Sequence, residues 1–247
     1  STTGSNSNTG TSSTDAFASI ATAVDFACTN DTIILLDGTY YEDSLEIKKN
    51  LVIGSQYLFD NDTNHIAATI IDGENDGWIM RWYASSGSWS DTTTNQLVGL
   101  TIQNGNSTNS SYAGGLSVSA YNSLTITHVR FKNNKNIRNV GGALRMDYDV
   151  HAQILHTEFV GNHSTHSGSA FYADRPYLVM RHVNIRNNTT TANNGGLLYV
   201  QSGTSYWDTK DVQVSNNSST SNRLIFINTE NLESNAVYDS WIIKNNS

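Results

Sequence analysis

The sequence predicts an all-β protein, a single-stranded right-handed parallel β-helix with about 27 residues per coil and an N-terminal capping helix. Three observations predict this fold. Small-residue pairs recur every 27 residues, and each unit ends with an apolar residue followed three places later by Asn. Within a unit, apolar and polar residues alternate as in half-buried strands. Such units bury their inward faces only by stacking on one another, which makes a solenoid.

The residues that define the repeat are predicted to be structural. The glycines that open the units are Gly114, Gly141, Gly168 and Gly195. The asparagines that close them are Asn134, Asn162, Asn188, Asn217 and Asn246. Asparagine tolerates left-handed backbone geometry at a corner, and side-chain amides stacked at about 4.8 Å can hydrogen-bond to each other. We therefore expect an asparagine ladder along one corner of the solenoid.

The chain divides into a lead-in and a β-helix domain. The predicted segments are a flexible lead-in at 1–13 and a β-helix domain at 14–247, which comprises a cap helix at 14–28, N-terminal coils at 29–113 with a protruding loop at 85–95, and regular coils at 114–247. Early strands are expected at 32–36, 45–47, 51–53, 69–71 and 97–102. Beyond the last corner no C-terminal cap is visible, and an uncapped coil edge invites strand addition.

The cap is predicted from apolar residues that fall on one helical face. Thr14 or Asp15 is the expected N-cap, and Cys28 is expected to be a buried small apolar residue. A short amphipathic helix of this kind would cover the open end of the solenoid.

Composition excludes several classes of protein. Acidic residues number 22 and basic residues 14, so the net charge of −8 argues against nucleic-acid binding. The single Cys excludes a disulfide scaffold and a multi-cysteine zinc module. No apolar run is long enough to cross a membrane. With 30 Asn among 247 residues, the chain is a folded, polar-surfaced protein whose asparagines need an explanation.

The motifs resemble a known group of proteins. Gly-Gly-Ala-Leu at 141–144 and Phe-x-x-Asn at Phe131 and Phe159 resemble the paired motifs of polymorphic outer-membrane protein repeats, found in many secreted bacterial β-helix proteins. The N-terminal run is similar to the start of pectin methylesterases and pectate-lyase-like proteins. Its marks are Asp31-Thr32-Ile33-Ile34, Asp37-Gly38-Thr39-Tyr40-Tyr41-Glu42, Leu51-Val52-Ile53-Gly54 and Thr69-Ile70-Ile71-Asp72-Gly73.

This resemblance covers roughly residues 15–247 and is specific for the fold. The catalytic signatures of the esterases have no match, and Arg175-Pro176-Tyr177 is only a superficial echo of one of them. The resemblance therefore implies a secreted or surface location more than an activity.

Three outward columns are candidates for function, because equivalent positions of a β-helix stack. Six residues before the corner asparagines lie His128, His156 and His182, followed by Asp211. Adjacent imidazoles could bind a transition metal with Asp211 or His163 nearby, respond to pH, or only stack on one another.

The second candidate combines aromatic and polar columns. Four residues after the first glycine of each unit come Val118, Arg145, Tyr172, Tyr199 and Phe226. Two residues further on come Ala120, Asp147, Asp174, Gln201 and Asn228. Aromatic rings beside carboxylates and amides are a sugar-binding combination. The alternatives are that the aromatic column only stabilises the solenoid, that it lies beneath a loop, or that Tyr172 and Tyr199 point inward.

The third candidate is a group of charges. Asp147 and Asp174 are expected one coil apart, with Asp149, Arg145 and Arg175 nearby. Paired carboxylates can share a proton, bind calcium, or serve with arginine in a hydrolase or lyase. No metal or cofactor is required by the sequence, although calcium or a transition metal is compatible with these columns.

Ten Asn-x-Ser/Thr sequons are compatible with a glycosylated secreted protein. They lie at Asn30, Asn61, Asn106, Asn109, Asn162, Asn187, Asn188, Asn216, Asn217 and Asn245. We expect an extracellular or cell-surface, non-catalytic structural and adhesive rod, whose partners are glycans or other surface proteins, without insertion into a membrane. The alternatives are a polysaccharide lyase or esterase-like carbohydrate-active enzyme, and a filament subunit that associates end to end.

Overall fold

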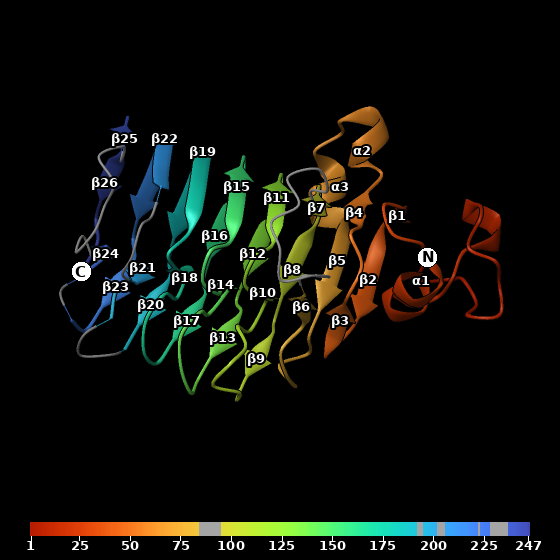
Figure 1. Ribbon diagram of the computed structural model, residues 1–247, viewed down its shortest axis with the longest axis horizontal. Helices are drawn as coiled ribbons and strands as arrows, with labels where there is room; N and C mark the ends of the chain where they lie inside the picture. Colours follow the sequence, from red (N-terminus) through yellow and green to blue (C-terminus); the bar gives the residue numbers. More distant parts are fainter. Residues whose placement is uncertain (84–94, 192–194, 202–205, 222, 228–236) are drawn as a thin grey trace.

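The computed structural model describes residues 1–83, 95–191, 195–201, 206–221, 223–227 and 237–247. All sheets are parallel and form a β-solenoid of about six turns, with about 29 residues per turn, which confirms the predicted fold class. The coils stack from the N-terminal end to the C-terminal end of an elongated molecule (Figure 1). Each regular coil runs through two rows of a large sheet, then a short sheet, then a third sheet, whereas the coils of β1 (Thr32–Leu35) and β4 (Val52–Ser55) have no strand in the short sheet.

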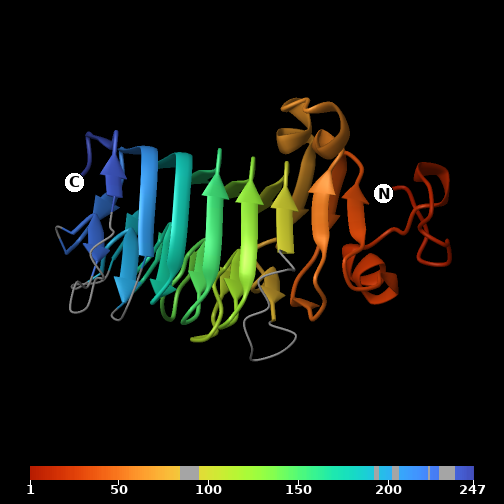
Figure 2. The same cartoon turned by 45° about the horizontal axis from the view of Figure 1, so that its top comes forward.

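The large sheet has 14 strands in two rows that meet at a corner. Row 1, seen broadside in Figure 2, contains β1 (Thr32–Leu35), β4 (Val52–Ser55), β7 (Asn95–Val98), β11 (Ser123–Thr127), β15 (His151–Leu155), the first halves of β19 (Tyr177–Arg186) and β22 (Tyr206–Ser215), and β25 (Val237–Asp239). Row 2 contains β2 (Gly38–Tyr41), β5 (Thr69–Asp72), β8 (Thr101–Gln103), β12 (Arg130–Lys132), β16 (Glu158–Val160), the second halves of β19 and β22, and β26 (Ile242–Lys244).

Two further sheets lie beside the large one. The seven-stranded sheet contains β3 (Leu45–Ile47), β6 (Met80–Trp82), β10 (Leu116–Val118), β14 (Leu144–Met146), β18 (Phe171–Asp174), β21 (Leu198–Gln201) and β24 (Ile225–Ile227). The five-stranded sheet contains β9 (Asn106–Ser107), β13 (Lys135–Asn136), β17 (His163–Ser164), β20 (Thr189–Thr190) and β23 (Ser218–Ser219).

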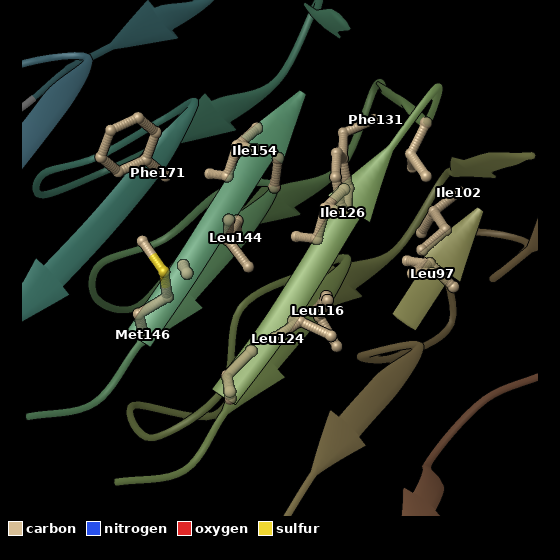
Figure 3. Close-up of a cluster of buried hydrophobic side chains, with 14 of the residues drawn as sticks. Leu97, Ile102, Leu116, Leu124, Ile126, Phe131, Leu144, Met146, Ile154 and Phe171 are labelled. Atoms are coloured by element: carbon tan, nitrogen blue, oxygen red, sulfur yellow. The ribbon is translucent and has the colours of Figure 1, made fainter. Parts of the chain in front are cut away.

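The core is a set of apolar columns, because inward side chains alternate with outward ones along every strand. Leu97, Ile126 and Ile154 are paired in register on neighbouring strands of row 1 (Figure 3). Phe131 and Phe159 stack with ring centroids 5.1 Å apart and ring planes 5° apart. All five side chains are completely or almost completely buried. The core therefore continues from coil to coil as the repeat requires.

The five corner asparagines form a continuous ladder between row 2 and the five-stranded sheet. Nδ2 of Asn134, Asn162 and Asn188 donates to Oδ1 of the next asparagine at 3.3, 3.0 and 3.0 Å. Asn217 donates to Asn246 at 3.0 Å in the same way. The left-handed geometry belongs to the preceding residue of each coil, which is Asn133, Gly161, Asn187, Asn216 or Asn245. Asparagine therefore has two separate roles at this corner, one in the backbone and one in the ladder.

The glycine column differs from the prediction by one residue in its first coil. The backbone N–H of Gly114 donates to the carbonyl oxygen of Gly142 at 3.0 Å, and Leu116 pairs with Leu144. Gly114 is therefore equivalent to Gly142, whereas Gly141, Gly168 and Gly195 are equivalent to one another. The physical reason for the small residue is clearance: a Cβ on Gly142 would lie 2.4 Å from the carbonyl oxygen of His163.

The N-terminal end is covered differently from the prediction. Helix α1 spans Ile20–Phe26 only, and its N-cap is Ser19, whose side chain accepts a hydrogen bond from Thr22 N. The predicted N-cap residues instead lie in the 3-10 turn η1 (Ser13–Asp15), after which extended backbone at Ala16 separates η1 from α1. Cys28 is exposed, so the prediction that it is buried was wrong.

The predicted lead-in makes defined contacts with the residues that follow it. The amino group of Ser1 donates to Phe17 O at 2.8 Å, and Asn6 Oδ1 accepts from the backbone of Ala18 and Ser19. These contacts place the first residues beside the start of α1.

Two features between β4 and β8 differ from the sequence-based expectation. Helices α2 (Tyr57–Asp60) and α3 (Asn64–Ala68) project from the N-terminal half of the solenoid (Figure 1). The strand expected at 97–102 is divided into β7 and β8 by Gly99, whose φ of +69° places a corner there. The predicted loop at 85–95 lies outside the described residues except for Asn95, which begins β7. No described helix is long and apolar enough to cross a membrane.

Candidate functional site

The outer face of the seven-stranded sheet brings the predicted aromatic and acidic columns together. Arg145, Tyr172, Tyr199 and Phe226 are paired in register on β14, β18, β21 and β24. The prediction that Val118 is the first member of this column was wrong. Ser117 pairs with Arg145, while Val118 points inward and is buried, because the first repeat is one residue longer than predicted.

The same one-residue difference affects the polar column. Val118 pairs with Met146, so Ser119 rather than Ala120 is level with Asp147. Asp174 pairs with Gln201 on the next coil. Asn228, the last predicted member, lies outside the described residues.

The aromatic column is a closed stack. Tyr172 and Tyr199 have centroids 5.7 Å apart at 10°, and Tyr199 and Phe226 have centroids 4.5 Å apart at 14°. Tyr172 is only 8% exposed, its hydroxyl donates to Gln201, and burial raises its pKa to about 12. Because the ring faces are used by neighbouring rings, only ring edges remain for a ligand. The stack therefore stabilises adjacent coils first and offers a ligand little stacking surface.

The five charged residues of the third candidate lie near one another as predicted, but the distances of their ion pairs differ. Arg145 Nε lies 2.9 Å from Asp147 Oδ1, whereas Arg175 contacts Asp149 and Asp174 only at 3.8 and 3.9 Å. Burial raises the pKa of Asp174, and the neighbouring carboxylates of Asp149 and Asp147 add to this, partly opposed by the arginines. A half-buried carboxyl with a raised pKa, close to other charges, is the arrangement found at many binding and catalytic sites.

A second aromatic cluster on the same face was not predicted. Arg81 lies over the rings of Tyr83 and Tyr112, at 3.8 and 4.7 Å from their centroids. The Tyr83 hydroxyl donates to Glu46 at 2.6 Å, and Trp78 packs against Tyr112. The signal was the alternation of Arg81 and Tyr83 around an apolar residue, but the early coils lack the clear repeat that would have aligned them with Arg145.

The histidine column is stacked at the corner between rows 1 and 2. His128 and His156 have centroids 4.6 Å apart, and His156 and His182 have centroids 4.7 Å apart. Tyr57 of α2 covers one end of the stack, and Asp211 Oδ2 lies 3.4 Å from His182 Nδ1 at the other. The three histidines have φ between 48° and 53°, a region that histidine enters more readily than most residues.

This geometry favours the stacking interpretation of the histidines over the metal interpretation. Face-to-face imidazoles direct their ring nitrogens side by side rather than toward a common point. Within the described part of the chain, no three His, Cys, Asp or Glu side chains are grouped so that they could hold a metal ion.

The histidines give a testable pH dependence. Burial, and then the charge of His156, lowers the pKa of His128 below its usual value. The unfolded chain therefore takes up a proton more readily, so this contribution to stability is present above about pH 6.5 and is lost as the pH falls below it. We expect His128→Asn, which keeps the corner geometry without titrating, to reduce the loss of unfolding free energy between about pH 7.5 and 5.5 in urea titrations.

His65 provides the opposite control. Hydrogen bonding to Asp37, and then to Asp60, raises the pKa of His65, so its contribution is present at low pH and is lost as the pH rises through the raised value. His65→Asn should therefore make the loss on acidification steeper. Equal slopes for the wild-type protein and both variants would contradict the assignment.

The sequon asparagines differ in exposure, because some of them belong to the buried ladder. Asn162, Asn188 and Asn217 are at most 1% exposed, so a glycan on any of them is incompatible with this fold. The sequon asparagines whose side chains are exposed are Asn30, Asn61, Asn109, Asn187, Asn216 and Asn245.

A cavity of about 650 Å³ lies at the N-terminal end, away from these columns. It is bounded by the N-terminal segment, α1 and β1, and Phe17, Ile20 and Phe26 contribute to its lining.

Comparison with known proteins adds little to this description. No family model and no curated protein matches the chain. A solved pectin methylesterase from Aspergillus niger, in a penultimately deglycosylated form, is 13% identical, with 92% of this chain and 88% of that chain covered and a TM-score of 0.29. This similarity is too weak to support an argument about activity.

Proposed function

We propose that this chain is a non-catalytic structural and adhesive rod of a secreted or cell-surface protein, of the kind built from polymorphic outer-membrane protein repeats. The proposal includes contact with glycans through the outer face of the seven-stranded sheet. The observation that carries it is the in-register pair of Asp174 and Gln201 beside the aromatic stack, with Asp147 directly after β14 on the preceding coil. A ladder of polar groups about 4.8 Å apart can hydrogen-bond to the hydroxyl groups of an extended sugar chain.

Two features of the structure support the rod. The asparagine ladder and the stacked core link every regular coil to the next, so the shape is fixed along its length. The outer face is rich in side chains that bind sugars by hydrogen bonding, while its closed ring stack limits stacking with a sugar. Glycan contact in this proposal therefore depends on carboxylates and amides, with ring edges in a secondary role.

Mutation of the polar column tests the proposal. On a glycan array, we expect Asp174→Asn combined with Gln201→Ala to reduce retention at least about tenfold, because two of the column's hydrogen-bonding groups are altered or removed. Asp76→Asn is the control, since Asp76 is an exposed carboxylate outside the seven-stranded sheet. Retention unchanged in the double variant, or absent in the wild-type protein, would overturn the proposal.

A carbohydrate-active enzyme is the second candidate, and the raised pKa of Asp174 beside Arg145 and Arg175 favours it. A carboxyl group whose pKa is raised is a better candidate for a general acid than one with an ordinary pKa. A panel of polysaccharide lyase and esterase assays separates the two functions. Turnover by the wild-type protein that is lost in Asp174→Asn would identify an enzyme, whereas retention on the array without turnover supports the rod.

A further inference from the structure

The net charge of −8 is distributed unevenly along the solenoid. Thirteen acidic and three basic residues lie in residues 1–95, whereas nine acidic and eleven basic residues lie in residues 96–247. The first part therefore carries a net charge of −10 and the second part +2. The solenoid is a polarised rod, and two such rods lying side by side repel each other least when they are antiparallel, because the acidic part of each then lies beside the weakly basic part of the other.

The positive charge is concentrated on the outer face of row 2. Arg130 and Arg186 each place Nε on one oxygen of Glu158, at 2.7 and 2.6 Å, and their side chains remain 40% and 38% exposed. In the neighbouring column, Val160 is paired in register with Lys132 on one side and with Arg186 on the other, and Lys132 is exposed. We call these five residues the basic face. Three cations surround one carboxylate there, so the face keeps a net charge of +2.

The complementary feature is a knob on the N-terminal half, formed by residues 57–62 around helix α2. Its tip is Phe59, which is 74% exposed, and it is followed by the carboxylates of Asp60, which also pairs with His65 Nε2 at 3.1 Å, and of Asp62. Tyr57 packs on His128 at 4.6 Å and anchors the knob to the solenoid. A large exposed aromatic side chain next to charged groups is typical of an interface anchor.

We propose that two copies of this chain associate side by side and antiparallel, with the knob of each copy on the basic face of the other. The knob follows β4, and the basic face lies on β12, β16 and β19, so β8 of row 2 lies between them along the solenoid. A two-fold axis near β8 brings both contacts together at once, as a self-complementary interface requires.

The chemistry of the contact follows from its two surfaces. Phe59 packs on Val160 and on the aliphatic stems of the neighbouring cations, while Asp60 and Asp62 pair with Lys132 and the two guanidinium groups. Two equivalent contacts form in each pair, so weak individual contacts are strengthened by their combination. These surfaces are separate from the proposed glycan face, so a test that overturns the dimer leaves the glycan contact unaffected, and the reverse.

Sedimentation velocity over a concentration series tests the dimer. We expect a dimer at about 50 mM NaCl that dissociates at about 500 mM, since exposed charge pairs are screened by salt. Phe59→Ser and Lys132→Glu should each weaken the dimer by about tenfold or more. Tyr148→Ser and Lys210→Glu are the controls, because they change an exposed aromatic residue and an exposed Lys away from both surfaces.

A charge exchange distinguishes a specific contact from a damaged fold. The double variant Asp62→Lys, Lys132→Glu restores opposite charges across the interface and is expected to regain the dimer at low salt. A wild-type protein that remains monomeric at low salt would overturn the proposal. The proposal would also be overturned if the single variants dimerised like the wild-type protein, or if the double variant formed a weaker dimer than Asp62→Lys alone and Lys132→Glu alone.

Discussion

Asn162→Ala is expected to lower the free energy of unfolding by about 3–5 kcal/mol, a large fraction of the stability of an ordinary domain. Asn162 Oδ1 accepts from Asn134 N and Nδ2 at 2.9 and 3.3 Å, and its Nδ2 donates to Phe131 O and Asn188 Oδ1, both at 3.0 Å. Alanine removes all four bonds, so the buried N–H of Asn134 and the carbonyl oxygen of Phe131 lose these partners, whereas Asn188 Oδ1 still accepts from the backbone N–H of Asn162. Each such group costs about 1–3 kcal/mol.

Urea denaturation followed by circular dichroism measures this loss. Asn184→Ala is the matched control, because Asn184 is an outward-facing asparagine of row 2 that is partly exposed. We expect its effect to stay within about 0.5 kcal/mol. An Asn162→Ala variant as stable as this control would show that the side-chain hydrogen bonds of the ladder do not stabilise the protein.

The ladder could be predicted from the sequence because it repeats. Each of its asparagines follows an apolar residue by three places, so a structural requirement that acts once per coil leaves a periodic trace. The fold class was predicted for the same reason. The trace does not say which of two adjacent asparagines is buried, and only the backbone shows that Asn187 turns the corner while Asn188 enters the ladder.

The candidate site was predicted less well, for two physical reasons. One extra residue in the first repeat moved the predicted column from Ser117 to the inward-facing Val118, since a shift of one residue in a strand exchanges its faces. Exposure was the second difficulty. Near the glycines the alternation does not determine whether Tyr172 points inward or outward, and its burial results from Arg145, Tyr199 and Gln201 packing around it.

Features that occur once in the chain left no periodic signal at all. Helices α2 and α3 have four and five residues, too few for a recognisable apolar period, and they interrupt the coils between β4 and β5. The exposed Phe59 and the cluster around Arg81 therefore emerge only from the three-dimensional arrangement.

The second large effect is expected for Phe159→Ala, which should destabilise the protein by about 3–5 kcal/mol. Phe159 is fully buried, stacks on Phe131 with centroids 5.1 Å apart, and lies 6.1 Å from Phe171 across the core. Alanine leaves a cavity and removes a ring pair that adds about 0.5–1.5 kcal/mol beyond burial. Leucine fills much of the space, so Phe159→Leu should cost clearly less.

The position of Phe159 also determines how the loss is distributed. A solenoid is stabilised by contacts between adjacent coils, so a cavity in β16 weakens the connection between the coils on its two sides. Hydrogen exchange read by mass spectrometry should therefore show the largest loss of protection in β12, β16 and β19, with smaller changes in β2 and β5. Val160→Ala, an outward change on the same strand, should leave the protection of these strands as it is in the wild-type protein. Uniform loss of protection along the chain would instead show that all coils unfold as one cooperative unit.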